Sequence, residues 1–140
     1  MSIVLYINAN KYTVAEKRAE LYNAGSVFLN ELMDDVDGEI SIIVSVKGSG
    51  LEEGVDGYCL CTEEHDDGKP KEFQVDIRGD MGLEHAIKCM AHEFVHVWQM
   101  CTGRIDENVY HNTKDYYNSP WEVEARELEQ PLYELYVNCV

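Results

Sequence analysis

Basic residues are scarce in this chain of 140 residues. Lys and Arg together number 11 against 27 Asp and Glu, so the formal net charge is -16 and the isoelectric point is near 4.5. A surface of this charge repels the phosphates of nucleic acids and of anionic lipids. We therefore expect no nucleic-acid partner and no membrane partner. The acidic residues are scattered and form no long block, but a nucleic-acid mimic that occupies a basic partner's groove is an alternative.

Long apolar runs are also missing. No stretch approaches the roughly twenty apolar residues that would span a bilayer. The apolar segment 1–9 is short, lacks a basic start and a small-residue cleavage site, and resembles a first strand more than a signal peptide. We therefore expect a soluble, cytoplasmic protein. The length predicts one domain, 1–140, that is large enough to bury a core.

Cysteines are too few and odd in number for a disulfide framework. The five are Cys59, Cys61, Cys89, Cys101 and Cys139. This usage fits a reducing compartment. Cys59 and Cys61 alternate on a predicted strand and share one face, where core packing is favoured over a metal clip.

What the chain does contain is the motif HExxH at 92–96, inside a predicted helix over 83–101. Residues four apart lie one turn above each other, so the imidazoles of His92 and His96 can bind one metal ion. Glu93 lies about 100° around the helix, where it is placed to act on a water as general base. This is the arrangement of zinc peptidases. A plain core helix is disfavoured, because burying these three polar side chains without a metal or partners is costly.

A second predicted helix, 121–137, begins after Ser119 and Pro120, which suit a cap and a first turn. Pro131 is expected to kink or split it. Glu122 lies three residues after the Ser cap, and a capping box is one interpretation of that spacing.

HExxH followed by a helix that carries ExxA resembles the gluzincin branch of zinc metallopeptidases, in which this second Glu is the third zinc ligand. More narrowly, HEFVHVWQ followed by Tyr and PWEVEA resembles small predicted peptidases encoded by bacteriophages, with a HExxHxxQ helix and a Y…PWExEA segment. The resemblance covers about residues 88–129. It implies a zincin-like α+β fold and Zn²⁺ held by His92, His96 and Glu122, with Glu93 as the catalytic base.

One position departs from the gluzincin pattern. Many gluzincins have Asp four residues after the ligand Glu, where it orients a His, whereas this chain has Arg126. Glu124 or Asp115 is then expected to supply the orienting carboxylate. Glu124 is also a rival third ligand, although two residues along a helix place it on nearly the opposite face from Glu122. His111 is another rival, because its spacing from His96 is similar to that of SprT-like proteases, whose third ligand is His.

The remaining pattern predicts β-α-β-β-β-α-α, a mixed sheet covered by helices, with a long helix at 13–33 and strands at 2–7, 40–46, 58–62 and 73–78. In zinc peptidases of this kind the strand before the active helix is usually the sheet edge, so we expect Val75 to meet an extended substrate. His85 and Cys89 fall near the face of His92 and His96 but receive no role.

The segment from Gly103 to Ser119 has no periodicity and is long for a loop, which predicts a wall or lid of the site. Tyr116 and Tyr117 lie at its end. We assign Tyr116 to hydrogen bonding with the oxyanion and Tyr117 to substrate binding, with packing as the alternative for either.

These observations predict a zinc-dependent peptidase acting on a peptide or protein substrate. Zinc lowers the pKa of water to about 7, and Glu93 takes the proton and returns it to the leaving amine. The alternative from another class is a zinc-stabilised binding module without turnover that sequesters a basic host protein. If the viral resemblance holds, the compartment is the host cytoplasm.

Overall fold

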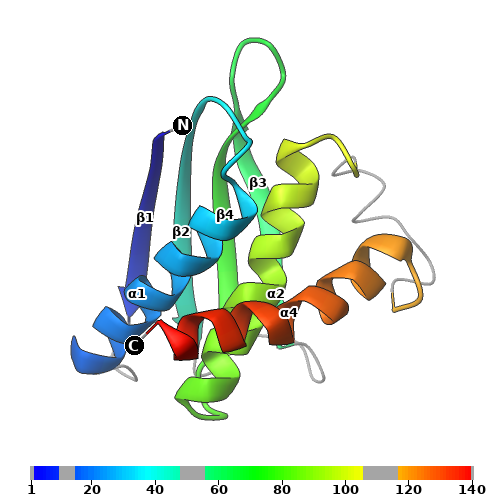
Figure 1. Ribbon diagram of the computed structural model, residues 1–140. Helices are drawn as coiled ribbons and strands as arrows, with labels where there is room; N and C mark the ends of the chain where they lie inside the picture. Colours follow the sequence, from blue (N-terminus) through cyan, green and yellow to red (C-terminus); the bar gives the residue numbers. More distant parts are fainter. Residues whose placement is uncertain (1, 10–14, 48–55, 106–116, 140) are drawn as a thin grey trace.

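The computed structural model describes residues 2–9, 15–47, 56–105 and 117–139. Their elements follow one another in the order β1 (Ser2–Ala9), α1 (Ala15–Leu32), β2 (Glu39–Lys47), β3 (Gly57–Glu64), β4 (Pro70–Arg78), α2 (Leu83–Cys101) and α4 (Pro120–Asn138) (Figure 1). This order confirms the predicted α+β class and the β-α-β-β-β-α-α pattern. The predicted start of the first helix at Thr13 lies outside the described residues.

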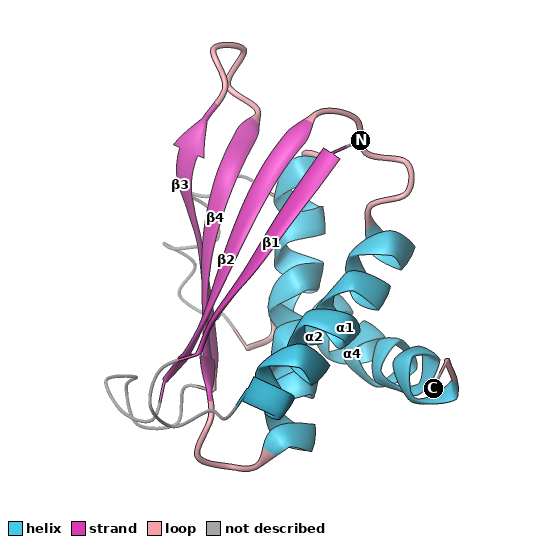
Figure 2. Ribbon diagram, turned by 90° about the vertical axis from the view of Figure 1, so that its left-hand side faces the viewer, coloured by secondary structure: helices cyan, strands magenta, loops and turns pink. Residues whose placement is uncertain are grey.

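The four strands form one mixed sheet in the order β1-β2-β4-β3. β1, β2 and β4 are parallel, and β3 is antiparallel to β4. Figure 2 shows the three helices on one face of this sheet. The two central strands are apolar and mostly β-branched on that face, and their buried hydrophobic residues are Ile40, Ile42, Val44, Val46, Phe73, Val75 and Ile77.

The expectation that β4 is the sheet edge is wrong. The turn between His65 and Lys69, with Gly68 at φ 86°, folds β3 back along the outer side of β4. Val75 therefore pairs with Val44 on one side and Cys59 on the other, and it is completely buried. It cannot meet a substrate. On this side of the sheet the outermost strand in the described part of the chain is β3.

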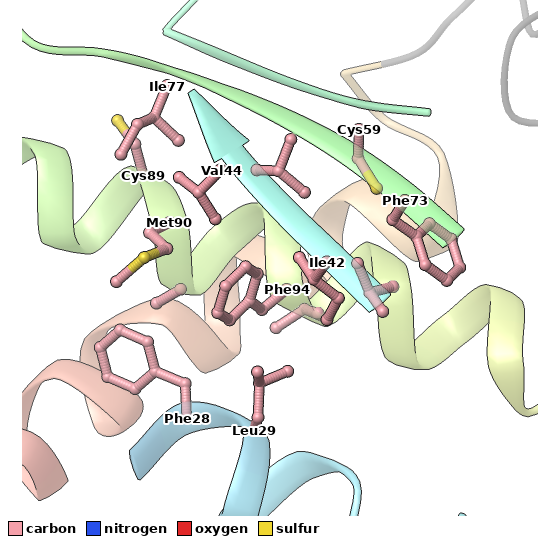
Figure 3. Close-up of a cluster of buried hydrophobic side chains, with 14 of the residues drawn as sticks. Phe28, Leu29, Ile42, Val44, Cys59, Phe73, Ile77, Cys89, Met90 and Phe94 are labelled. Atoms are coloured by element: carbon pink, nitrogen blue, oxygen red, sulfur yellow. The ribbon is translucent and has the colours of Figure 1, made fainter. Parts of the chain in front are cut away.

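The core lies between the sheet and the helices. Figure 3 shows Phe28 of α1 and Phe94 of α2 packed near Ile42 and Val44 of β2, with Met90 beside them. Phe94 is 0% exposed, and full burial of such a side chain stabilises the fold by about 1.5–3 kcal/mol. The apolar face of α2 is therefore fixed against the sheet. Its other face is directed toward α4.

The two helices that carry the predicted site residues have the predicted bounds to within one residue. α2 covers Leu83–Cys101 and α4 covers Pro120–Asn138. Ser119, which has extended backbone angles, caps the start of α4 at Pro120, and the helix continues through Pro131 without being split. Within the described ranges, no helix is both long enough and apolar enough to cross a membrane.

Candidate metal centre

Three side chains from two helices converge at the crossing of α2 and α4. His92 Nε2 lies 2.8 Å from Glu122 Oε1, and His96 Nε2 lies 2.9 Å from Glu122 Oε2. The two imidazole rings are 5.1 Å apart between centroids and nearly perpendicular, at 78°. His96 is completely buried, and Glu122 is nearly so. The structure therefore brings together the three ligands that the resemblance implied.

This donor set fits a zinc ion. Two imidazole nitrogens and a carboxylate oxygen are the protein ligands of many catalytic zinc sites. One donor atom from each of His92, His96 and Glu122 lies within 4.8 Å of the others. Ligand atoms bound to tetrahedral zinc at about 2.0–2.2 Å lie roughly 3.3–3.6 Å apart, so the three side chains need only small movements to bind the ion.

Both oxygens of the Glu122 carboxylate are directed at the histidines, and the Ser119 side chain makes no cap hydrogen bond to α4. The geometry therefore favours the ligand interpretation of Glu122 over the capping box. The reason is spatial, since Glu122 lies in the first turn of α4 and contacts both His92 and His96 of α2.

The other nitrogen of each ring is also held. His92 Nδ1 lies 3.1 Å from Glu129 Oε1, and His96 Nδ1 lies 2.8 Å from Gln99 Oε1. With its Nδ1 bonded to an acceptor, each ring directs its Nε2 toward the shared point. Glu129 and Gln99 thus orient the two rings, a role that the sequence had given to Glu124 or Asp115.

The Glu124 carboxylate lies farther from the two histidine rings than the Glu122 carboxylate does. Its Oε1 accepts a hydrogen bond of 2.9 Å from Gln99 Nε2, and its Oε2 lies 3.3 Å from Arg104 Nη1. Gln99 Nε2 also donates to the Trp121 carbonyl at 2.9 Å. The Glu124 carboxylate therefore contacts Gln99 and Arg104 instead of the histidine rings, which argues against its being the third ligand. It acts on His96 only through Gln99.

Three predicted residues cannot be placed. His111, Asp115 and Tyr116 lie outside the described residues, as does most of the predicted wall or lid. Their assignments stay predictions.

His92 and Glu122 shift each other's pKa in opposite directions. Burial lowers the pKa of His92, but the hydrogen bonds with Glu122 and Glu129 outweigh it and raise the pKa to about 10. Burial acts to raise the pKa of Glu122, but the hydrogen bonds from His92 and His96 outweigh it and hold that pKa well below its usual range. The cluster is thus an ion pair, and a cation held there would require His92 to give up a proton.

Glu93 lies beside the cluster without taking part in it. The side chain is buried, and its Oε1 has no hydrogen-bond partner in the described part of the chain. Burial raises the pKa of this carboxyl, while the nearby His96 and His92 oppose the shift. Gly57 leaves the space that Glu93 fills, because a Cβ there would lie 2.9 Å from Glu93 Oε2. A buried carboxyl group with an unpaired oxygen next to candidate metal ligands is suited to hold and transfer a proton.

A pocket of about 460 Å³ opens onto these groups, and His92, Glu93, Glu122 and Glu129 line it. Tyr117 also lines the pocket, and the Arg126 guanidinium lies 3.8 Å from the centroid of its ring. Arg126 Nη1 is 3.9 Å from Glu122 Oε1. Arg126, the residue that departs from the gluzincin pattern, therefore lies against Glu122 and Tyr117 at the same time.

Sequence reasoning missed the roles of Gln99 and Glu129. Gln99 is the last residue of the HExxHxxQ segment, three residues after His96, and Glu129 lies seven residues after Glu122, which is two turns on the same face of α4. Both spacings are visible in the sequence. The contact of Gln99 with His96 lies within α2, whereas the contact of Glu129 with His92 depends on how α4 crosses α2, and the sequence does not give that crossing.

No protein-family model, curated protein or solved structure matches this chain. The interpretation of the site therefore rests on its own geometry and on the motif that the sequence carries.

The geometry predicts a ranking of zinc affinities among single Ala variants of α4. Glu122→Ala removes a ligand and should weaken zinc binding the most, by more than 100-fold as an order of magnitude. Glu129→Ala removes the partner of His92 and should cost about 10–100-fold. Glu124→Ala acts only through Gln99 and should cost less. Competition with a chromophoric chelator measures the three affinities, with the exposed Glu127→Ala as the matched control.

The ligand assignment would be overturned if Glu124→Ala weakened zinc binding more than Glu122→Ala did. Equal effects of Glu129→Ala and Glu127→Ala would remove the orienting role of Glu129.

Proposed function

We propose that this protein is a zinc-dependent peptidase of the gluzincin type. The observation that carries the proposal is the convergence of both histidine Nε2 atoms on the Glu122 carboxylate from a second helix. The buried Glu93 carboxyl beside them, with one unpaired oxygen, supplies the remaining group that such chemistry needs.

His92, His96 and Glu122 would hold the ion. A bound zinc ion polarises a peptide carbonyl and makes water more acidic, to a pKa of about 7. Glu93 accepts the proton of the attacking water and returns it to the leaving amine. Its burial raises its pKa, which brings the carboxyl closer to the range in which it can both accept and donate a proton.

Substrate would bind along β3 instead of β4. An extended peptide adds to the outer strand of a sheet through main-chain hydrogen bonds. Of the two outer strands in the described part of the chain, β1 and β3, it is β3 that begins at Gly57, directly against Glu93. A peptide added to β3 would therefore pass the pocket in which Glu93 and the ligands lie. Tyr117 and Arg126 line the same pocket and are placed to contact it.

The zincin-like fold and the kinship with phage-encoded peptidases belong to the same proposal. They are supported by the order of the parts: a strand hairpin, then the HExxH helix on the sheet, then a helix that returns a Glu to both histidines. The α+β arrangement with its mixed sheet is compatible with such a fold.

Replacing the base should separate turnover from metal binding. Glu93→Gln keeps the volume but cannot take a proton, so hydrolysis should fall by about 10²–10⁴-fold or more while one zinc stays bound. His96→Ala should lose both zinc and hydrolysis. Digestion of a peptide library, read by mass spectrometry beside the zinc content, measures both quantities. Glu127→Gln, exposed on α4, is the matched control.

Two outcomes contradict the proposal. Loss of zinc in Glu93→Gln would make Glu93 a ligand and not a base. No cleavage by the zinc-loaded wild-type protein at any pH would instead favour the zinc-stabilised binding module.

A further inference from the structure

Three more potential ligands gather where α2 begins. His85 and Cys89 are four residues apart on α2, so they lie one turn apart on one face. Asp56 directly precedes β3, and its carbonyl accepts a hydrogen bond of 2.9 Å from the Arg78 backbone N–H, which fixes its place. His85 Nε2 lies 3.4 Å from Asp56 Oδ2, and one donor atom from each of the three residues lies within 4.8 Å of the others.

We propose that Asp56, His85 and Cys89 form a second metal site, for a divalent ion of the zinc class. A thiol sulfur, an imidazole nitrogen and a carboxylate oxygen together favour zinc and its neighbours over magnesium or calcium, which prefer oxygen ligands alone. The proposal goes beyond the peptidase function, because that chemistry requires one ion only.

The donor atoms of this cluster are available for a cation. His85 Nε2 is buried and has no hydrogen-bond partner among the residues that the structure describes. Cys89 is 9% exposed and lines the pocket. Burial raises the pKa of its thiol to about 12, so without a cation it is neither a nucleophile nor a redox-active thiolate at neutral pH. A bound ion would displace that proton, as zinc does with other cysteine ligands.

The rival interpretation is a plain ion pair between Asp56 and its basic neighbours. Arg78 Nη1 lies 3.5 Å from Asp56 Oδ1, but Arg78 is already held by Asp80 at 2.6 Å. The Asp56 side chain is 49% exposed, so pairing with Arg78 or His85 is worth little. An ion pair also gives no role to Cys89, whereas a metal site uses all three side chains.

The second site opens into the same pocket as the first. Asp56, His85 and Cys89 line the pocket of about 460 Å³ that also holds His92 and Glu93. One face of α2 therefore presents two pairs of ligands, His85 with Cys89 and His92 with His96. An ion in the second site adds positive charge to the pocket wall that carries Glu93.

Cobalt titration of the metal-free full chain tests the second site, because cobalt bound to a thiolate gives a charge-transfer band in the near ultraviolet. The wild-type protein should bind two equivalents and show this band, since Cys89 is the sulfur ligand of the cluster. Cys89→Ser should abolish the band and remove one equivalent. His85→Ala, at a partly exposed position, should weaken that equivalent by at least about tenfold. The exposed Cys139→Ser is the matched control and should behave as wild type.

Glu122→Ala keeps the two sites apart in this test. This variant should lose the equivalent of cobalt that binds at His92 and His96. It should keep the equivalent that binds at Cys89, together with the charge-transfer band. A failure of the first site is therefore distinguishable from a failure of the second. Binding of a single equivalent without the band by the wild-type protein would overturn the second site, whereas a single equivalent with the band would instead contradict the first. A band that survives Cys89→Ser, or one that disappears in Glu122→Ala, would also overturn the second site.

Discussion

The carboxylate of Glu122 lies between two imidazole nitrogens that another helix supplies, and the rest of the site is arranged around that contact. Removing a carboxylate from water without compensation costs several kcal/mol. Here the cost is offset by two hydrogen bonds of 2.8 and 2.9 Å to His92 and His96, or by a metal ion in their place. In both cases the contact of Glu122 with His92 and His96 fixes where α4 crosses α2 and which face of α4 is directed toward α2.

Additional contacts fix the same crossing at its two ends. Gln99 of α2 donates to the Trp121 carbonyl at the start of α4, and Tyr133 near its other end donates to Glu84 of α2 at 3.0 Å. Beneath them, Phe94 and Met90 anchor α2 on the sheet (Figure 3). His92, His96 and Glu122 thus stand on packed helices and not on loops, an arrangement that would give a metal site the preorganisation it needs. The same rigidity holds Glu93 against Gly57, where it can serve as a base.

The sequence allowed those parts of the structure to be predicted that depend on local spacing. The bounds of α2, the shared face of His92 and His96, and the start of α4 after Ser119 all follow from helical periodicity and capping. The position of β4 inside the sheet does not follow from local spacing. Either strand of the β3–β4 hairpin could have paired with β2, and that pairing joins residues far apart in the sequence. Glu129 was missed for a similar reason, since its contact with His92 is set by the angle between two helices. Gln99 contacts His96 within α2, so its spacing was visible, but its partner among the polar groups around it was not.

X-ray absorption at the zinc edge, on protein loaded with one equivalent, tests the central claim most directly. The account predicts a first shell of nitrogen and oxygen atoms at about 2.0–2.2 Å, with the outer scattering of two imidazole rings. A shell dominated by sulfur at about 2.3 Å, or protein that comes out free of zinc after loading, would contradict it.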